Sequence, residues 1–442
     1  MKNRKILVIS HNVFDRRTNM GKTLSGFFTD WNPDRLAQLY LHSEIPTSDI
    51  CHKYYRITDT DALKSVFWGN GKRVGRPFSQ VDIDANVASS RTDKGIKRKI
   101  YSFGRKRTSF IYAARNAVWH ASHWYSESLK NWIADFSPDV IFFAAGDYAF
   151  LYDLAYIISR DFDIPIVMYC CDDFFINRRN PESLLGFPVY WLFMKHVRRC
   201  ISRTAEMVTI CEKMADAYRG LFDIPIQAVY TGYSCKDVPD VDGEGIVYLG
   251  NLGACRGQSL VDIGKALRKV TNQIGMPLHL DVYSAETKPD LLNGLSEENG
   301  ILFHGAVDRE EVRQIIAKSR LVVHTESFAK EDRQKVMFSI STKIADLLAS
   351  GRCIFAYGPD DVASMEYLAK NHAACVVDHP ERLEETLTDI LTNREGRSKV
   401  VHSAMMLADR NHDPVLVQEK IRKIIERSCG RTSLVSLERN GC

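Results

Sequence analysis

Short apolar runs alternate with longer segments of helical periodicity along most of the chain. In the first half we predict four buried strands: Ile6–Ser10, Val140–Ala144, Ile166–Tyr169 and Met207–Ile210. Each run is followed by a polar or glycine-containing turn and then by a helix-like stretch. This alternation is typical of parallel sheets with crossover helices. The first half is therefore predicted to be a doubly wound α/β domain.

A polar segment, Ser234–Gly245, interrupts this pattern and is predicted to be a linker. After it the pattern resumes with six predicted strands: Ile246–Leu249, Leu278–Tyr283, Ile301–Phe303, Leu321–His324, Cys353–Ala356 and Ala374–Val377. Helices are predicted between them, including Gln258–Ile274, Arg309–Ser319 and Lys343–Ala349. We therefore expect two doubly wound domains, residues 1–235 and 236–412, followed by a helix and frayed tail, 413–442. Such sheets bind ligands beyond the carboxyl ends of their strands, and an interdomain cleft is the expected site.

The composition is that of an ordinary globular protein. The 442 residues include 59 Lys and Arg against 55 Asp and Glu, a net charge of +4, which is too mild to require a nucleic-acid partner. The chain is long enough to bury the cores of two or three domains. Apolar residues make up 45% and charged residues 26%, so we do not expect extensive disorder.

The cysteines and acidic triplets do not predict a metal site. The 11 cysteines form no Cys-x-x-Cys pair and no Cys/His cluster at zinc spacing. Asp-x-Asp triplets occur at Asp82 to Asp84 and at Asp161 to Asp163, but neither follows a predicted strand convincingly. Scattered thiols, no secretory signal and no apolar run of 18 residues lead us to expect a cytoplasmic protein.

Two loops of the second domain carry groups suited to phosphate. Ser341, Thr342 and Lys343 stand where an apolar-periodic helix begins, and unpaired backbone N–H groups at such a position attract anions. A simple helix cap is the alternative. In the other loop, Gly250 and Asn251 follow a strand and precede Arg256 and Gly257, which give close backbone approach and a forked cationic donor. Arg256 and Lys343 could then flank one diphosphate.

The second half resembles the donor-binding half of GT-B glycosyltransferases, particularly the large retaining family that includes many polysaccharide-assembly enzymes. Four segments carry the resemblance in the family's order. They are Gly250–Gly257, similar to a Gly-Arg-Leu then Lys-Gly loop; Phe303–Val307 with its following Arg309–Val312; Leu321–Phe328, similar to a strand ending in Pro-Ser then Glu-Ser-Phe-Gly; and Asp346–Gly351, similar to Glu-Ala-Met-Ala-Ala-Gly. The resemblance implies a GT-B fold of two Rossmann-like domains, with a last helix crossing back onto the first domain.

The resemblance also implies roles for residues of the donor site. Glu326 would contact the hydroxyls of the donor sugar and Asp346 those of the ribose, while the His304–Gly305 loop would lie at the nucleobase, and Ser327 and Phe328 would line the donor site. Two departures weaken the ribose assignment. Nineteen residues separate Glu326 from Asp346, where the family has seven, and they include the charged insertion Ala329–Lys335. Asp also replaces Glu at the second position.

The first domain supplies the acceptor side of the expected site. His11 and Asn12 follow the first strand, and Gly21, Lys22 and Thr23 open a helix in a manner similar to the family's glycine turn. The spacing does not match a Walker A loop, so an ATPase is not expected.

Three acids follow other predicted strands: Asp147, Asp172 and Asp173. The family often has a histidine near Asp147, which this chain lacks, so Asp147 is offered as a substitute. Asp172 or Asp173 could orient an acceptor hydroxyl, with capping of the next helix as an equal alternative.

The segment Lys94–Arg107 has seven Lys and Arg residues, no acid, and apolar residues among them. Such a stretch can attach to an anionic membrane surface, and a solvated loop with a helix face is the alternative. We therefore expect either a free cytoplasmic protein or one held peripherally at the inner face of the membrane.

These features predict a glycosyltransferase that moves a sugar from a UDP- or GDP-linked donor to a hydroxyl of a saccharide or lipid-linked saccharide, in surface polysaccharide assembly. Neither a resident cofactor nor a metal is expected, and the family resemblance implies retention. Two alternatives remain: a UDP-sugar 2-epimerase on the same fold, and a non-catalytic subunit that binds nucleotide sugars.

Overall fold

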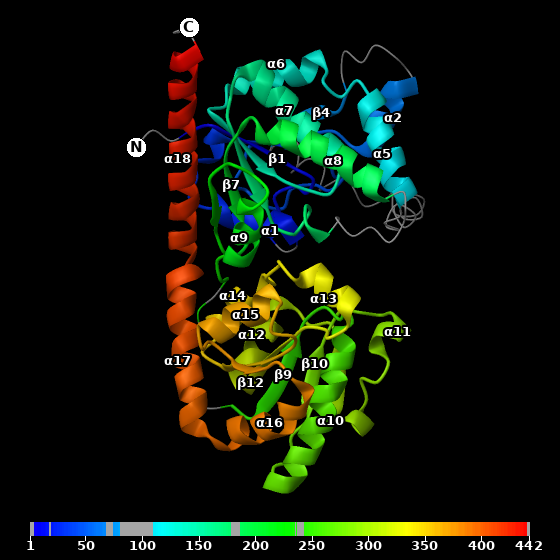
Figure 1. The fold of residues 1–442 in the computed structure, drawn as a ribbon, viewed down its shortest axis with the longest axis vertical. Coiled ribbons are helices and arrows are strands. Elements are labelled where there is room, and N and C mark those ends of the chain that lie inside the picture. Colours follow the sequence, from blue (N-terminus) through cyan, green and yellow to red (C-terminus); the bar gives the residue numbers. More distant parts are fainter. Residues whose placement is uncertain are drawn as a thin grey trace. The chain divides into compact units, whose positions relative to one another are not determined.

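The computed structural model describes residues 4–16, 19–67, 74–79, 109–177, 186–234, 236 and 243–439. It divides into two compact units, one of Met1–Val229 with Gln418–Cys442 and one of Tyr230–Val417 (Figure 1). The basic segment Lys94–Arg107 and the acidic triplet Asp82 to Asp84 lie outside the described residues.

The first unit is built on an eight-stranded sheet in the order β4-β3-β2-β1-β5-β6-β7-β8. All neighbouring strands pair in parallel except β3 and β4, which are antiparallel. The strands are β1 (Ile6–Ser10), β2 (Leu36–Tyr40), β3 (Lys53–Arg56), β4 (Arg76–Ser79), β5 (Val140–Ala144), β6 (Ile166–Cys170), β7 (Thr204–Thr209) and β8 (Ile226–Ala228). The helices are α1 (Asn19–Phe27), α2 (Asp59–Phe67), α5 (Ser109–Ala121), α6 (Glu127–Phe136), α7 (Ala149–Phe162), α8 (Gly186–Ile201) and α9 (Glu212–Arg219).

The second unit is built on a six-stranded, wholly parallel sheet in the order β11-β10-β9-β12-β13-β14. Its strands are β9 (Gly245–Leu249), β10 (Leu280–Tyr283), β11 (Ile301–Gly305), β12 (Ser319–Thr325), β13 (Cys353–Tyr357) and β14 (Cys375–Val377). Its helices are α10 (Arg256–Ile274), α11 (Pro289–Leu292), α12 (Arg309–Lys318), α13 (Lys330–Val336), α14 (Lys343–Leu348), α15 (Ala363–Lys370), α16 (Leu383–Thr392) and α17 (Arg394–Asn411).

The central strands form because continuous apolar runs can be covered on both faces by crossover helices. Every residue of β1, β5, β6 and β13 is buried. All ten strands predicted from apolar runs are present, with ends shifted by a few residues. The strands β2, β3, β4 and β8 were not predicted. The last two are short edge strands of three or four residues, whose sequences give little periodic signal.

The final helix, α18, runs from Pro414 to Arg439, within the residues predicted to form a helix and frayed tail, 413–442. From Gln418 onward it belongs to the first unit. There the Gln418 amide donates to the carbonyl of Gly26 on α1 at 3.1 Å, and Arg427 forms a 2.9 Å ion pair with Glu206 on β7. Within the described residues, no helix combines the length and apolar character that a membrane span requires.

Candidate active site

In each sheet the strand order reverses at one point, and the residues beyond the strand ends there are the natural ligand-binding positions. In the second unit this point lies between β9 and β12, which are neighbours. The loop after β9 leads to Arg256, and the segment after β12 begins with Glu326. The topology thus brings together two candidate residues that are 70 positions apart in sequence.

The loop between β9 and α10 is held by its own hydrogen bonds. The Tyr248 hydroxyl donates to the carbonyl of Asn251 at 2.7 Å, and the Asn251 side chain accepts from the backbone N–H of Gly253 at 2.5 Å. Ala254 and Cys255 then both adopt left-handed backbone angles, with φ of 55° and 50°. Such angles are costly for residues other than glycine and occur often at functional sites. They place Arg256 as the first residue of α10.

Arg256 and Glu326 form a two-pronged ion pair. The guanidinium donates from Nε to Oε2 at 3.0 Å and from Nη2 to Oε1 at 3.1 Å, and Nε also reaches the carbonyl of Thr325 at 3.2 Å. The Glu326 side chain is 2% exposed and that of Arg256 is 19% exposed. A planar guanidinium matches a carboxylate in this geometry better than a lysine could. The pair therefore fixes the orientation of Arg256.

Further groups hold Glu326 in place. The Ser364 hydroxyl donates to Oε1 at 3.4 Å, and the Ser259 hydroxyl donates to the Glu326 carbonyl at 2.9 Å. Burial raises the pKa of Glu326, an effect that the neighbouring Arg256 charge opposes. A carboxylate buried this deeply is stable mainly because its cationic partner and these hydroxyls remain in place.

His324, on β12 two residues before Glu326, belongs to the same cluster and was not selected from the sequence. Its Nε2 lies 3.6 Å from Oε1 of Glu326, and among the described residues this nitrogen has no hydrogen-bond partner. Burial lowers the pKa of His324 to about 3, assisted by the charges of Arg256 and Lys343, so the ring is neutral at physiological pH. The sequence signal was a polar residue in an apolar strand immediately before a candidate carboxylate.

Lys343 completes the cluster. Its ammonium donates to the carbonyl of Leu249, the last residue of β9, at 3.3 Å. Although the residue as a whole is exposed, atoms crowd its ammonium, and this loss of water together with the Arg256 charge lowers the pKa of Lys343 to about 8. Among the ion pairs of the described residues, none includes Lys343. The cluster therefore has two cations close together, of which only Arg256 forms an ion pair among the described residues.

The start of α14 differs from the expected hydroxyl-rich phosphate cap. The helix has only six residues, and the Thr342 side chain makes no capping hydrogen bond. Ser341 Oγ accepts weakly from the Lys343 N–H at 3.4 Å, so this hydroxyl acts partly as a local cap. Asp346 accepts from the backbone N–H of Ser234 at 2.6 Å. This contact gives Asp346 a structural use, and its ribose role stays a prediction.

The insertion between Glu326 and Asp346 forms helix α13. Arg333 pairs with Asp361, and Lys335 pairs with Asp332 at 2.9 Å. The Cys255 thiol hydrogen-bonds the Asp332 carboxylate, which helps to lower the pKa of Asp332. Thus the extra residues fold beside the loop that presents Arg256.

The remaining donor-side candidates lie at the same carboxyl edge. His304 Nε2 contacts Asp281 at 2.5 Å, and its ring stacks on Tyr283 with centroids 4.6 Å apart. Gly305 has a φ of 77°, which favours glycine, and Gly257 lies in the buried first turn of α10. The Ser327 hydroxyl accepts from the Ala329 N–H at 3.1 Å, and Phe328 packs on Tyr357. Gly250 donates its N–H to the Tyr283 carbonyl at 3.0 Å.

In the first unit the strand order reverses between β1 and β5. After β1, the Ser10 hydroxyl and the Gln38 amide both donate to the carbonyl of Asn12, at 2.7 and 3.1 Å. Burial lowers the pKa of His11 to about 4, with Arg115 and His42 adding to the effect. His11 Nδ1 is buried and has no hydrogen-bond partner among the described residues. The ring is therefore neutral and held within a charged group that includes Asp147.

Gly21 is required for packing: a Cβ there would lie 2.3 Å from the carbonyl of Val13. Of its two neighbours on α1, Lys22 is exposed and Thr23 is half-buried. After β5, Asp147 accepts a short hydrogen bond from the Tyr112 hydroxyl of α5. The acceptor role of these residues stays a prediction.

Asp173 serves the turn after β6. Its Oδ1 accepts from the N–H groups of Phe175 and Ile176 at 3.1 and 3.0 Å and from the Tyr218 hydroxyl at 2.9 Å. Its Oδ2 accepts from the Asn177 N–H at 2.9 Å. These four hydrogen bonds favour the capping alternative over an acceptor role. The neighbouring Asp172 is exposed and accepts from the Asp173 N–H at 2.9 Å.

Comparison with known proteins places these sites in a known fold. Residues 265–422 match a family model described as glycosyl transferase-like. HepE of Anabaena, solved in complex with UDP and glucose, superposes with a TM-score of 0.59 over 96% of this chain and 100% of its own, at 11% identity. The chain has the GT-B fold.

Two further GT-B structures match over similar lengths. The α,α-trehalose 6-phosphate synthase of Burkholderia multivorans has a TM-score of 0.59 and 12% identity, covering 98% of each chain. The sucrose-phosphate synthase of Thermosynechococcus elongatus has a TM-score of 0.58 and 10% identity, covering 96% of this chain and 99% of its own. No curated protein sequence matches the chain. The GT-B fold predicted from four motifs is confirmed.

Proposed function

We propose that this protein is a glycosyltransferase that transfers a sugar from a nucleoside diphosphate sugar to an acceptor hydroxyl. The observation that carries the proposal is the cluster of Arg256, Lys343, Glu326 and His324 at the strand-order reversal of the second unit. Two neighbouring cations, of which only Arg256 pairs with a carboxylate among the described residues, attract an anion, and the buried neutral His324 adds no competing charge. A diphosphate suits this charge pattern.

In this proposal the cluster stabilises the leaving group. When the bond between the anomeric carbon and the diphosphate oxygen breaks, negative charge develops on the diphosphate. Arg256, held by Glu326, and Lys343, held by the Leu249 carbonyl, are cations set in place before that charge appears. Such preorganised charge is often the largest contribution to an enzyme's rate. In this proposal Glu326 acts by orienting Arg256, and its contact with sugar hydroxyls stays a prediction.

We propose that transfer retains the anomeric configuration. The acceptor oxygen then bonds to the anomeric carbon on the face from which the diphosphate leaves, and the leaving phosphate oxygen takes the acceptor's proton. No protein base is needed for this step, and no resident metal, because Arg256 and Lys343 supply the positive charge. The family resemblance of the four motifs, together with these two cations, supports this version of the reaction.

A UDP-linked sugar is the first donor to test, because HepE was solved with UDP and a UDP-forming trehalose-phosphate synthase has the same fold. A GDP-linked sugar is the second. For the acceptor we propose a saccharide or lipid-linked saccharide of a surface polysaccharide, met in the cytoplasm at the inner face of the membrane. The composition of Lys94–Arg107 supports the membrane contact, although that segment lies outside the described residues.

The experiment is a donor-consumption assay with UDP- and GDP-linked sugars, run with and without a mixture of saccharide and lipid-linked saccharide acceptors. The proposal predicts nucleoside diphosphate release that is much faster with acceptor, and a new glycosidic bond of unchanged anomeric configuration. An epimerised donor formed without acceptor would instead indicate an epimerase. Donor binding with neither transfer nor hydrolysis would indicate a non-catalytic subunit.

A further inference from the structure

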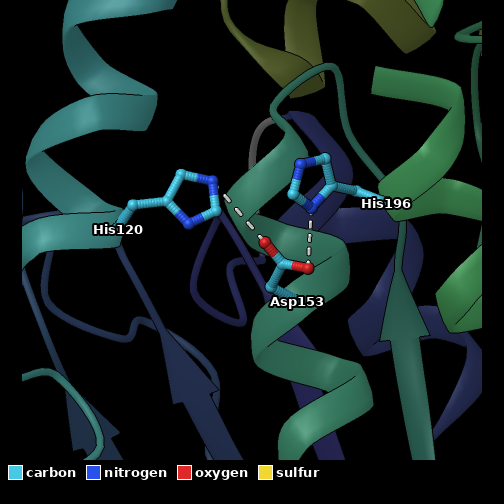
Figure 2. Close-up of side chains that lie close together, drawn as sticks. All are labelled: His120, Asp153 and His196. Carbon is cyan, nitrogen blue, oxygen red and sulfur yellow. Dashed lines mark hydrogen bonds and ion pairs between the residues drawn. The ribbon is translucent and has the colours of Figure 1, made fainter. Parts of the chain in front are cut away.

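A second group of chemically active side chains lies on helices of the first unit. His120 of α5, Asp153 of α7 and His196 of α8 point toward one another from three helices (Figure 2). Their nearest nitrogen and oxygen atoms all lie within 4.8 Å of one another. Sequence spacing gives no sign of this group, since His196 and Asp153 alone are 43 positions apart.

Asp153 stands between the two histidines and contacts each with a different oxygen. Its Oδ1 lies 2.8 Å from Nδ1 of His196, and its Oδ2 lies 3.6 Å from Nε2 of His120. The Asp153 and His196 side chains are 11% and 18% exposed, whereas His120 is 46% exposed. The group is therefore anchored on its inner side and reachable from solvent on its outer side.

A row of contacts between α5 and the region of α7 sets the positions of His120 and Asp153. At successive turns of α5, the Tyr112 hydroxyl donates to Asp147, the Asn116 side chain accepts from the Phe150 N–H at 3.2 Å, and His120 faces Asp153. The first two contacts set the register of the helices. They bring His120 close to Asp153. The two side chains do not form a hydrogen bond with each other, since 3.6 Å is too long for one.

Two imidazoles and a carboxylate form a ligand set suited to a borderline divalent cation such as zinc. Bonds of about 2.0–2.2 Å to zinc place neighbouring ligand atoms about 3–3.5 Å apart. The two contacts of Asp153, one from each carboxylate oxygen, measure 2.8 and 3.6 Å, and one ligand atom from each of the three residues lies within 4.8 Å of the others. Closing the remaining gap needs a modest rotation of the exposed His120, with water at the fourth position.

We propose that His120, Asp153 and His196 form a binding site for a zinc-like divalent cation that joins α5, α7 and α8. A cation there would tie α5, which follows the basic segment, to the two helices behind it. Through the same row of contacts it would steady Tyr112 against Asp147. The cation has no part in the transfer reaction proposed above, and the inference does not rest on that function.

The test is equilibrium binding of Zn²⁺ to the metal-free full-length protein, by competition with a chromophoric chelator. Wild type, His120→Ala and a matched control, His402→Ala, are compared. His402 is an exposed histidine on α17 of the second unit, so its loss tests for general histidine binding. We expect one tight site in wild type and in the control, and affinity reduced by more than about 100-fold in His120→Ala, because even outer-shell partners contribute 10- to 100-fold.

Two further measurements guard against misfolding and stray binding. Zn²⁺ should raise the melting temperature of wild type but not of His120→Ala, whose exposed substitution should leave the metal-free melting temperature nearly unchanged. Co²⁺ should give the visible absorption of a low-coordinate site only in proteins with all three ligands. Equal zinc affinity in wild type and His120→Ala, or no tight site in wild type, would overturn the proposal and leave a hydrogen-bonded His–Asp–His group.

Discussion

Two carboxylates illustrate how differently strand-end acids can be used: Glu326 after β12 in the second unit and Asp173 after β6 in the first. The carboxylate oxygens of Asp173 accept hydrogen bonds from three backbone N–H groups of its own turn and from one nearby tyrosine hydroxyl. Glu326 instead binds a guanidinium from another loop, with a neutral histidine and a low-pKa lysine nearby. The first carboxylate stabilises a turn. The second holds a cation in place next to another cation.

The two acids differ in whether a charged group beside them remains without an ion pair. Around Asp173, four donors from the same neighbourhood occupy both carboxylate oxygens, which favours a structural use over ligand binding. Around Glu326, Arg256 is paired, whereas the neighbouring Lys343 forms no ion pair among the described residues, and the closeness of the two cations contributes to the lowered pKa of Lys343. A fold keeps like charges together against their repulsion chiefly where a ligand of opposite charge relieves it.

The largest expected effect is on stability, in Arg256→Ala. This change leaves Glu326 buried without its partner, so we expect the free energy of unfolding to fall by about 3 kcal/mol. Denaturant melts measure it. The double variant Arg256→Ala/Glu326→Gln, which also removes the buried charge, should regain a large part of the loss. If Arg256→Ala were as stable as wild type, the ion pair between Arg256 and Glu326 would not stabilise the fold as described.

Lys343→Ala should leave the fold intact and reduce the rate of transfer by about 100-fold or more, because a cation at the leaving diphosphate is lost. Steady-state kinetics with saturating donor measures this. Lys399→Ala is the matched control, since Lys399 is an exposed lysine of the same unit, paired at 2.7 Å with Glu395. Equal rates for both variants would remove Lys343 from the mechanism.

Asp173→Ala should lower the free energy of unfolding by about 2 kcal/mol, because several N–H groups of the turn lose their acceptor. Its affinity for nucleotides should be unchanged. Asp172→Ala, at the exposed neighbouring position, should cost less than about 1 kcal/mol. If Asp173→Ala instead folds as well as wild type but loses transfer, the comparison fails and Asp173 belongs to the acceptor site.

The smallest expected effect is a pH dependence. With a pKa of about 8, Lys343 of the free protein loses its charge as pH rises through 8. The affinity for UDP should therefore fall by about tenfold between pH 7 and pH 9 if only the charged form binds. Lys343→Arg keeps its charge over that range, so its profile should be flat. A profile of the same slope in both proteins would assign the titration to another group.

The sequence predicted much of the fold because its central strands are continuous apolar runs followed by helical periods. Edge strands such as β4 were missed, since their few residues are not buried on both faces. Of the candidate site, Arg256, Glu326 and Lys343 were predicted from motifs and indeed lie together. Their mutual pairing was not predictable, because it depends on which side chains the crossovers bring into contact.

Other residues had only a weak or ambiguous signal in the sequence. His324 reads as one polar residue within an apolar strand, and only burial beside Glu326 makes it part of the site. Asp173 and Glu326 have the same local pattern, a carboxylate after a buried strand, and the structure alone separates their roles. The His120, Asp153 and His196 group depends on three helices meeting, which no local spacing encodes.

The most direct test of the central claim is calorimetric titration of UDP and GDP into wild type and Lys343→Ala. The account predicts that wild type binds at least one of the two nucleotides, and that Lys343→Ala, with an unchanged melting temperature, binds it at least about tenfold more weakly because one charge contact to the diphosphate is lost. Equal affinity in the two proteins, or no binding of either nucleotide by wild type, would contradict the claim that this cluster is a diphosphate site.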